Sequence, residues 1–397
     1  MGLVRVAVVG AGFAGLAAAD ALSRAGVEVV VLEARERVGG RVWSRTLTNG
    51  AIVEMGAEFV LPGNDLVRET CDRLGLELAD KRMFYGDREP RGVAVDAAQL
   101  HLGVEAVRAA LEARGDDGEA VDAATFLDGL DLHPATRETI RARAEVSCAA
   151  TADRFPASTL AHLAAISQDP CPTVRGGNQR IAIDLAAGLD VRLRSPVERV
   201  AWGEGGVRVR AAGAEVEADR VVLALPASLV GRVAFDPGLP EPLAGAYAGV
   251  AYGNAAKLFV PLRETPPPSA VLSVPERYWT WTADAGEGVQ QVVHAFAGSA
   301  PALAALRVGE GPERWVESIL RLRPDLAIDP ADAVLSTWDD DPWVGAAYSC
   351  AVPSVEAWAP VGPVHACGEH TAGELSALME GALRSGLRAA AEVLGAR

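Results

Sequence analysis

Residues 4–34 read VRVAVVGAGFAGLAAADALSRAGVEVVVLEA, and this stretch decides the fold. Its apolar start predicts a buried strand, which a glycine turn and a helix rich in Ala and Leu follow. Gly26 marks the end of that helix, and residues 27–32 predict a second strand. The order strand, helix, strand predicts a βαβ unit with two parallel strands.

The turn between the first strand and the helix has the spacing G-x-G-x-x-G, with Gly10, Gly12 and Gly15. Such glycines allow a tight turn, the close approach of a pyrophosphate and close helix–strand packing. The helix start offers free N–H groups and a positive dipole end to phosphates. Glu33 ends the second strand, where a carboxylate can hold ribose hydroxyls. We therefore predict a dinucleotide site rather than a purely structural turn, and up to here both NAD and FAD fit it.

The next residues, EARERVGGRVWS at 33–44, resemble the second signature of FAD proteins of the glutathione-reductase type, especially the amine oxidase superfamily. Gly39 and Gly40 let the backbone pass close to a cofactor, and Arg41 brings a fixed charged fork to the pyrophosphate or the flavin edge. The resemblance implies FAD rather than NAD. The cofactor contacts that it implies in this run are Ala34, Arg35, Gly40 and Arg41.

The rest of the chain, taken in order, resembles the flavin-dependent monoamine oxidase family over its whole length. VEMGAEFV at 53–60 alternates like a strand and resembles the strand that faces the flavin. The resemblance implies an α/β fold. It consists of a Rossmann FAD-binding domain of the glutathione-reductase type and a mixed α+β substrate-binding domain, both discontinuous. The FAD-binding domain takes residues 1–75, 173–245 and 333–397, and the substrate-binding domain takes residues 76–172 and 246–332.

The C-terminal stretch ACGEHTAGELSALMEGALRSG, residues 366–386, resembles the family's segment under the flavin. A helix starting near residue 379 would aim backbone N–H groups at the flavin and stabilise the negative charge that reduction leaves there. A bulky residue at Gly381 would hold the ring away, and an apolar stripe of Leu383, Leu387, Ala390 and Leu394 would pack on the core. Beyond the N-terminal run, the cofactor contacts that the resemblance implies are Gly56, Ala57, Glu58, Val197, Gly368, Glu369, Met379, Glu380 and Ala382.

Three residues carry the chemistry that the resemblance implies. Lys257 would hold a water near the flavin and assist its reoxidation by O2; the alternative is a lysine that extends from a strand end to solvent. Trp338 and Tyr348 would frame the substrate, although aromatic residues also serve as core. Ala347 stands where members with covalently attached flavin have cysteine, which implies non-covalent FAD. Leu378 replaces the second aromatic residue of the family's paired cage.

The stretch at 56–59 also bears on the substrate. The amino-acid-oxidising branch of the family places an arginine for the substrate carboxylate in this stretch, whereas this chain ends it with Phe59. We therefore expect no carboxylate clamp at this position, and Phe59 and Leu378 are the predicted substrate contacts. Glu58 favours an ammonium-bearing or neutral substrate, and the alternative for Glu58 is a supporting hydrogen-bonding role.

Composition limits the remaining functions. The chain has 397 residues, a formal net charge of -16 and singly scattered lysines and arginines, which disfavours nucleic acid and anionic membranes as partners. Five cysteines without CxxC spacing disfavour a disulfide framework, and His365, Cys367 and His370 lack the spacing of a metal site. The N-terminus leaves no room for a leader, and no apolar run reaches membrane-spanning length. We therefore predict a cytoplasmic protein.

The expected activity is that of an FAD-dependent amine oxidase. A hydride passes from the α-carbon of an amine to flavin N5, the imine hydrolyses to an aldehyde or ketone plus ammonia, and O2 reoxidises the flavin with formation of H2O2. The alternative is a flavoprotein desaturase or dehydrogenase that acts on a C–N or C–C bond of a biosynthetic intermediate. A flavin-binding interaction module is disfavoured, because no long inserted coiled coil is present. The partners are then a small amine and O2, and a homodimer stays open.

Overall fold

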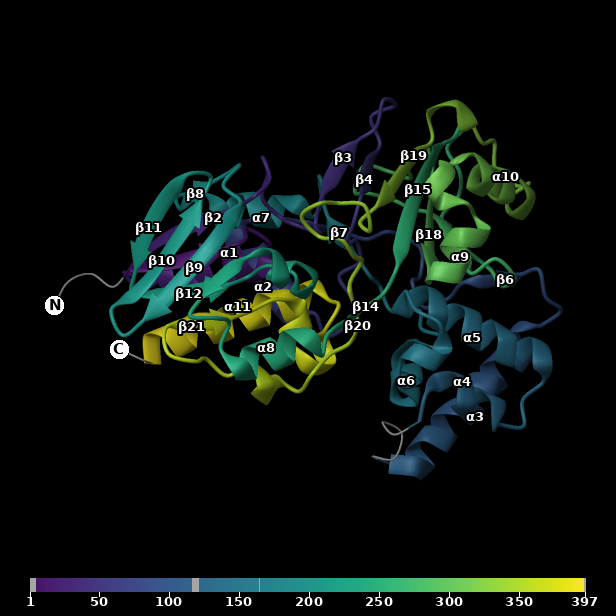
Figure 1. The fold of residues 1–397 in the computed structure, drawn as a ribbon. Helices are drawn as coiled ribbons and strands as arrows, with labels where there is room; N and C mark the ends of the chain where they lie inside the picture. Colours follow the sequence, from purple (N-terminus) through teal and green to yellow (C-terminus); the bar gives the residue numbers. More distant parts are fainter. Residues whose placement is uncertain (1–4, 116–120, 164, 396–397) are drawn as a thin grey trace.

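The computed structural model describes residues 5–115, 121–163 and 165–395. Figure 1 shows two halves: a nucleotide-binding half on the left and, on the right, a second sheet with a helical lobe below it. The first and last parts of the chain, purple and yellow, lie together in the left half. The chain therefore enters and leaves the nucleotide-binding half more than once, as the resemblance implies.

A five-stranded parallel sheet forms the centre of the nucleotide-binding half, with the order β21-β12-β1-β2-β8. Its strands are β21 (Val364–Ala366), β12 (Arg220–Leu223), β1 (Arg5–Val9), β2 (Glu28–Leu32) and β8 (Asp190–Arg192). In β1, Val6 and Val8 pack into one core cluster and Ala7 and Val9 into another. Both faces of the sheet are thus buried, which explains the continuous apolar strands in the sequence.

Four helices cover one face of this sheet, and a small mixed sheet with one helix covers the other. The first set is α1 (Phe13–Arg24), α2 (Asp65–Leu74), α7 (Gln179–Ala186) and α11 (Met379–Gly395). The second set is β9 (Val197–Gly203), β10 (Gly206–Ala211), β11 (Ala214–Ala218), β13 (Ala234–Asp236) and α8 (Glu241–Ala248), with the strand order β11-β10-β9-β13. The βαβ unit of β1, α1 and β2 is confirmed.

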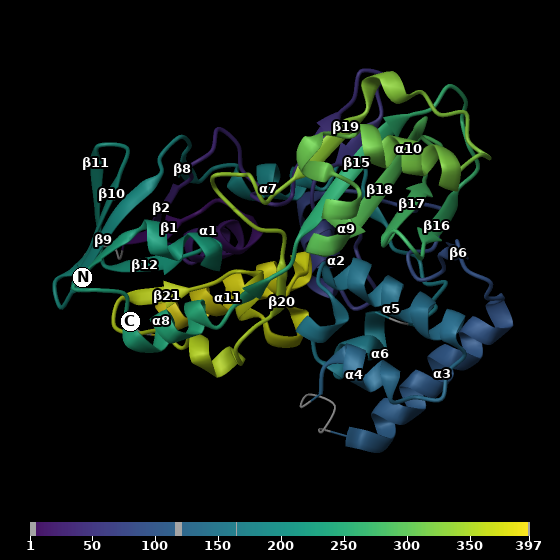
Figure 2. The ribbon, with the colours of Figure 1, turned by 45° about the vertical axis from the view of Figure 1, so that its right-hand side comes forward.

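Helix α11 packs along α1 through small residues (Figure 2). A Cβ at Gly386 would overlap the carbonyl oxygen of Ala14. The predicted apolar stripe is only partly right, because Leu383 and Ala390 are buried whereas Leu387 is 36% exposed. The close helix crossing rotates the contact face toward Gly386, which a pattern of large apolar residues does not reveal.

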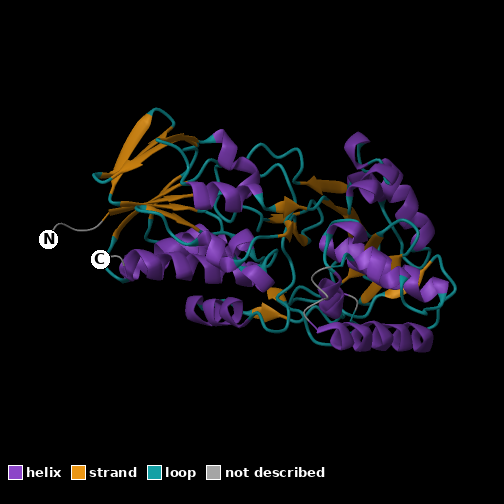
Figure 3. Ribbon diagram, turned by 60° about the horizontal axis from the view of Figure 1, so that its bottom comes forward, coloured by secondary structure: helices purple, strands orange, loops and turns teal. Residues whose placement is uncertain are grey.

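A six-stranded sheet, with the order β19-β15-β18-β17-β16-β6, forms the centre of the second half. Its strands are β6 (Glu89–Arg91), β15 (Ala255–Pro261), β16 (Ser269–Ser273), β17 (Tyr278–Thr282), β18 (Val292–Gly298) and β19 (Val334–Thr337). One face packs on α9 (Ala300–Ala305) and α10 (Glu313–Leu322), and the other faces α5 (Pro134–Cys148) of the helical lobe. The lobe also holds α3 (Ala97–Arg114), α4 (Ala123–Asp128) and α6 (Leu160–Leu163). Figure 3 shows the helices gathered beside the strands in each half.

Short strand pairs connect these parts and correct some predicted boundaries. They are β3 (Ser44–Thr46) with β4 (Ile52–Glu54), β5 (Leu78–Ala79) with β7 (Thr173–Val174), and β14 (Ala251–Tyr252) with β20 (Ser349–Ala351). The predicted strand at 53–60 is therefore too long, because regular pairing stops at Glu54. The boundary predicted at 245 falls inside α8, and the one at 333 separates β19 from its partner β15. In the described parts of the chain, no helix is long and apolar enough to span a membrane.

Candidate active site

One cavity of about 1320 Å³ lies between the two halves, lined by residues from both. It exceeds the roughly 300–1,000 Å³ of a typical small-molecule pocket, so it has room for a dinucleotide and a second ligand. Every predicted site residue lines it except Gly15 and Glu380. The predicted site residues that line the cavity are Gly10, Gly12, Glu33, Ala34, Arg35, Gly40, Arg41, Gly56, Ala57, Glu58, Phe59, Val197, Lys257, Trp338, Tyr348, Gly368, Glu369, Leu378, Met379 and Ala382.

The three glycines of the N-terminal turn have different reasons to lack a side chain. Gly10 has φ +107°, and a Cβ there would lie 2.8 Å from the carbonyl oxygen of Ala224. A Cβ at Gly15 would overlap the carbonyl oxygen of Gly10. A Cβ at Gly12, in contrast, would meet no protein atom within 4 Å and would stand in the cavity. Gly12 also starts α1 without a side-chain cap, so free N–H groups face the cavity, and the site fits a pyrophosphate.

Glu33 is fixed at the end of β2 by two backbone groups. Its Oε2 accepts from the Ala11 N–H at 2.8 Å, and its Oε1 accepts from the Arg35 N–H at 2.8 Å. Each oxygen keeps a second acceptor position, so the carboxylate can still hold ribose hydroxyls. The Arg35 guanidinium donates to both carboxylate oxygens of Asp341, at 2.7 and 2.6 Å. No pattern in the sequence pointed to Asp341, because the two residues meet only in the folded chain.

Arg41 and Glu369 form a partly buried ion pair at 2.8 Å, and Arg41 also donates to the Ala347 carbonyl at 2.8 Å. Glu369 further accepts from the Ala377 N–H at 2.8 Å. Burial by itself would raise the pKa of Glu369, but the neighbouring Arg41 outweighs it and lowers that pKa. A Cβ at Gly56 would overlap the Arg41 carbonyl oxygen. These contacts join the segments around 41, 56 and 369 into one wall of the cavity.

Leu378, just before α11, and Met379 and Ala382 in its first turn line the cavity, and the first-turn N–H groups carry the positive end of the helix dipole. Glu380 points away from the cavity. Its oxygens accept from the N–H groups of Leu66 and Val67, at 3.1 and 2.9 Å, in the first turn of α2. The prediction of Glu380 as a cofactor contact is therefore wrong for the side chain, which caps α2 from another helix.

Gly381 is likewise explained by protein packing, not by the cofactor. A Cβ there would overlap the carbonyl oxygen of Leu375, and Gly381 is not among the residues that line the cavity. The expectation that a larger residue would hold a flavin ring away is corrected accordingly. The larger residue would instead displace the turn before α11.

Lys257 ends in a buried charge cluster with Glu58 and Lys81. Lys257 Nζ donates to Glu58 Oε2 at 2.6 Å and to the Gly56 carbonyl at 3.1 Å, and Lys81 Nζ donates to Glu58 Oε1 at 2.8 Å. Trp281 Nε1 also donates to Glu58 Oε1, at 3.1 Å. Burial by itself would raise the pKa of Glu58, but the two ammonium groups lower that pKa well below its usual range. Burial lowers the pKa of Lys257, although the nearby negative charge of Glu58 acts to raise it.

Both carboxylate oxygens of Glu58 thus have cationic partners within the protein. The expectation that Glu58 favours an ammonium-bearing substrate is corrected, and its supporting hydrogen-bonding role is the arrangement found. The Lys257 ammonium has three N–H donors, of which two have these protein acceptors. The third is available to a ligand in the cavity that Lys257 lines.

Aromatic rings form the wall of the cavity on the side of the six-stranded sheet. Phe59 packs against Tyr85, Trp279 and Trp281, with ring centroids 4.9, 5.7 and 5.6 Å away, and the two indoles stack at 4.1 Å. Sequence reasoning missed the two tryptophans. Their signal was the alternation in β17, which puts residues 279 and 281 on one face of the strand.

The two aromatic residues predicted for catalysis have separate surroundings. Tyr348 donates its hydroxyl to the Ser147 carbonyl at 2.7 Å, so it offers the substrate its ring and not its hydroxyl. Trp338 lies beside Trp43 at 6.4 Å and under the Arg35 guanidinium at 5.8 Å, which places it with the nucleotide-binding half. Their catalytic roles stay predictions.

Comparison with known proteins places this site in a family. The model of the family described as flavin-containing amine oxidoreductase matches residues 13–394. AofH of Mycobacterium tuberculosis, provisionally named a flavin-containing monoamine oxidase, is 29% identical over 98% of this chain and 96% of its own length. Putrescine oxidase of Kocuria rosea is 28% identical over 98% of this chain and 95% of its own. The solved structure of putrescine oxidase bound to putrescine superposes with a TM-score of 0.84, covers 99% of both chains and is 26% identical.

Proposed function

Because the chain belongs to the flavin-containing amine oxidoreductases, we propose that its cavity holds FAD without a covalent bond and an amine beside it. The protein is an FAD-dependent oxidoreductase that acts on an amine. Bound FAD would supply the oxidant of this family, a hydride acceptor for the α-carbon of the amine, and hydrolysis of the resulting imine would give an aldehyde or ketone plus ammonia.

The observation that carries the proposal is that a single cavity joins Gly12 and Glu33 to Lys257 and the aromatic wall. Gly12 leaves space that no protein atom fills, at a helix start whose N–H groups suit a pyrophosphate. Ala347 offers no sulfur for a covalent bond to a flavin. The nucleotide end is therefore suited to FAD, and the aromatic end to a substrate.

The protein's own residues would assist in two ways. The apolar lining around Phe59 and the indoles disfavours an ammonium ion, so a bound amine would lose a proton more readily and become reactive. Lys257, with one donor free, would place a water or O2 near the reacting centre and stabilise negative charge that develops on oxygen. We include O2 as the final electron acceptor in the proposal.

We also propose that the enzyme works in the cytoplasm, as a monomer or homodimer. Five free cysteines support a reducing compartment. Fractionation of the source cells tests the location, and light scattering of the purified protein gives the oligomeric state.

The visible spectrum of the purified protein tests the function. We expect the purified protein to show flavin absorbance bands. Denaturation should release the flavin into solution as free FAD, because FAD is not covalently attached to the protein. Anaerobic mixing with panels of primary amines, polyamines and amino acids should bleach the bands with one class. A protein without flavin refutes the proposal, and bands that no amine bleaches favour the desaturase or dehydrogenase alternative. Gly12→Val is the matched control, since it fills the cradle and should abolish flavin binding.

A further inference from the structure

Two buried arginines of the cavity wall have no acidic partner in the part of the chain that the structure describes. Arg88 is 4% exposed and Arg143, on α5, is 7% exposed, and both line the cavity. Among the ion pairs of the described residues, none includes either side chain. Buried charges in proteins are normally paired, so these two call for an explanation.

The Arg88 guanidinium is only partly satisfied by the protein. Its Nε donates to the Tyr85 carbonyl at 3.1 Å, while Nη1 and Nη2 have no hydrogen-bond partner within residues 5–115, 121–163 and 165–395. The group lies 3.8 Å from the centre of the Trp279 ring and 4.4 Å from that of Tyr85. Stacking on these rings fixes its plane, so its two outer nitrogens form a preset fork beside the cavity.

Arg143 and Ser147 add donors from the same helix, α5. Arg143 donates from Nε to the Leu163 carbonyl at 3.0 Å and from Nη2 to the Tyr85 carbonyl at 3.2 Å. Ser147 Oγ is buried without a partner and lines the cavity as well. Among the described residues, the hydrogen-bond acceptors of the two guanidinium groups are carbonyl oxygens, and the Tyr85 side chain is the polar group that acts most strongly on Arg88. Neither guanidinium meets a carboxylate there, and Arg88 keeps unpaired donors.

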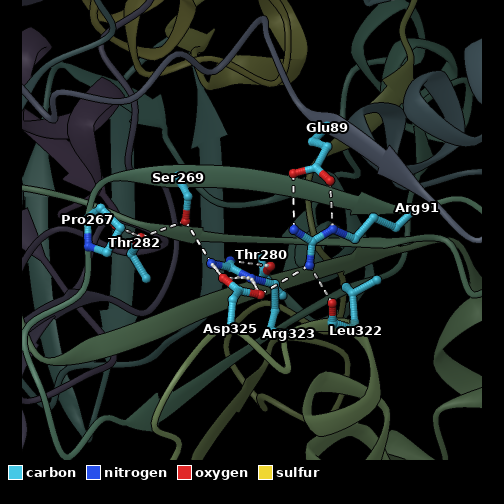
Figure 4. A network of polar contacts seen from close by, with 9 residues as sticks. All are labelled: Glu89, Arg91, Pro267, Ser269, Thr280, Thr282, Leu322, Arg323 and Asp325. Atoms are coloured by element: carbon cyan, nitrogen blue, oxygen red, sulfur yellow. Dashed lines mark hydrogen bonds and ion pairs between the residues drawn. The ribbon is translucent and has the colours of Figure 1, made fainter. Parts of the chain in front are cut away.

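Arg323 shows how this protein treats a buried arginine that has a structural role (Figure 4). It is 1% exposed, and its Nη2 donates to Asp325 and Ser269, both at 2.8 Å. Nη1 donates to Thr280 at 3.2 Å, and Nε to Asp325 at 3.1 Å. Every nitrogen of Arg323 is satisfied and its charge is neutralised, in contrast to Arg88.

The electrostatic consequences are consistent with a positively charged end of the cavity. Burial, and then the neighbouring Arg88, lower the pKa of Arg143 to about 9, and burial also lowers the pKa of Arg88. Burial would raise the pKa of Tyr85, but Arg88 outweighs it, and that pKa falls. Asp87 acts on Arg143 from a distance, but it is exposed and accepts from Gln168 at 3.2 Å. An anion in the cavity would relieve this unfavourable state.

We propose that Arg88 and Arg143, with Ser147, form a carboxylate-binding subsite, and that the substrate is an amine that carries a carboxylate. The inference rests on the proposed amine oxidation. Arg88 lies over Trp279, Trp279 stacks on Trp281, and Lys257 Nζ is 5.4 Å from the Trp281 ring. The subsite is thus connected by one row of aromatic rings to the predicted reacting centre.

Arg88 and Arg143 lie outside the stretch at 56–59, where the amino-acid-oxidising branch would have its arginine, and Phe59 of that stretch packs on the same Tyr85 and Trp279 rings as Arg88. The absence of an arginine from that stretch therefore does not exclude amino acids. A diamine, which carries a second positive charge, would meet two uncompensated guanidinium groups there. The structure thus separates this chain from a diamine oxidase in spite of its overall likeness to putrescine oxidase.

Ligand titrations of the oxidised holoenzyme test the subsite without turnover. Benzoate and its neutral counterpart benzamide are added, and the change of the flavin spectrum gives each Kd. We expect Arg88→Met to weaken benzoate binding roughly 10- to 100-fold, the range of charge-assisted hydrogen bonds, and to leave benzamide unchanged. Arg323→Met is the matched control and should change neither Kd. Equal binding of benzoate by the wild type and Arg88→Met overturns the proposal, and tighter binding of inorganic phosphate than of benzoate overturns the carboxylate assignment.

Thermal unfolding separates a binding role from a structural one. Arg88→Met keeps an apolar side chain on Trp279 and removes an unpaired charge, so its Tm should equal or exceed that of the wild type. Arg323→Met removes the buried donors that bind Asp325, Ser269 and Thr280, although Asp325 keeps Arg91 at 3.1 Å, and should lower the Tm. A large loss of Tm in Arg88→Met would assign Arg88 to the fold instead.

The rate at which substrates reduce the flavin of the wild type tests the proposal without any variant. Amino acids should bleach the flavin at least tenfold faster than the amines formed by their decarboxylation. If amines bleach the flavin as fast as the corresponding amino acids, the carboxylate-binding subsite is refuted and the proposed function is retained. If benzoate binding depends on Arg88 but no amine bleaches the flavin, the subsite is retained and the proposed amine oxidation is refuted.

Discussion

Glu58→Gln removes the negative charge that two buried ammonium groups share. Both oxygens of Glu58 bind lysines, at 2.8 Å to Lys81 and 2.6 Å to Lys257. Breaking a buried ion pair by removing one partner costs about 3–5 kcal/mol. We expect the free energy of unfolding, from urea titrations at pH 6, to fall by this amount. Lys81→Met in the same variant should recover part of the loss, because it removes one of the two uncompensated charges.

The pH dependence provides a second check. The pKa of Glu58 is depressed, so its contribution in the wild type is complete above the unfolded value of about 4.3 and constant between pH 6 and 9. In the variant, Lys257 loses the charge that raises its pKa, and the folded protein then binds fewer protons than the unfolded chain. Stability of the variant therefore rises with pH toward the unfolded lysine pKa of about 10.4, and the deficit at pH 9 should be smaller than at pH 6.

Glu54→Gln is the matched control, because burial raises the pKa of Glu54 to about 7 and its oxygens accept from neutral groups of Asn178 and Ser44. At pH 6 this carboxyl is largely protonated, so its amide analogue should cost only about 1 kcal/mol, the worth of one hydrogen bond. As the pH rises through 7, the wild type loses the advantage of its neutral carboxyl, and the control should approach it in stability. Equal costs for Glu58→Gln and Glu54→Gln at pH 6 would refute the reasoning, as would a Glu58→Gln deficit that does not shrink at pH 9.

Other variants address the cofactor end and the chemistry. Gly15→Ala should lower the Tm, because the added methyl group overlaps the Gly10 carbonyl oxygen. Gly12→Ala should keep the Tm of the apoprotein and lower its affinity for FAD. Equal flavin content in Gly12→Ala and the wild type would contradict the role of Gly12 in FAD binding. Glu380→Gln should cost about 0.5–2 kcal/mol by weakening the cap of α2 and leave the flavin spectrum unchanged, which absorbance and urea unfolding measure together. Lys257→Met should slow reoxidation by O2 more than anaerobic reduction in stopped-flow experiments, and equal slowing of both half-reactions removes the role of Lys257 in reoxidation.

Local patterns were sufficient for the nucleotide-binding half. The alternation of buried strands, the Ala-rich helix and the glycine spacing of residues 4–34 depend on neighbours in the chain, so the βαβ unit and the placement of Glu33 were predictable. The order of later segments, compared with a known family, extended this to the cofactor and to most of the cavity lining. The predicted domain boundaries were less accurate. Helix α8 packs on the nucleotide-binding half and β19 pairs with β15 of the six-stranded sheet, and no local sequence signal shows which half an element joins.

Several side chains acquired their roles only through remote contacts. Glu380 belongs to the family's cofactor motif by sequence, yet it caps α2 because the fold brings residues 66 and 67 beside it. From the sequence, Glu58 was expected to favour a cationic substrate. In the folded chain, Lys81 and Lys257, from two other segments, bind its carboxylate oxygens.

The sequence by itself thus determined the Rossmann unit, because it depends on short-range periodicity and on the spacing of adjacent glycines. The resemblance of its motifs to a known family added the cofactor class and the amine oxidoreductase family. The tertiary structure decided which charges are neutralised. Arg88 is one of many arginines in the printed chain, and only the packing around Trp279 shows that its outer nitrogens are buried, unpaired and beside the cavity. Charge compensation is a property of distances between segments far apart in sequence, and the substrate class that we propose follows from it.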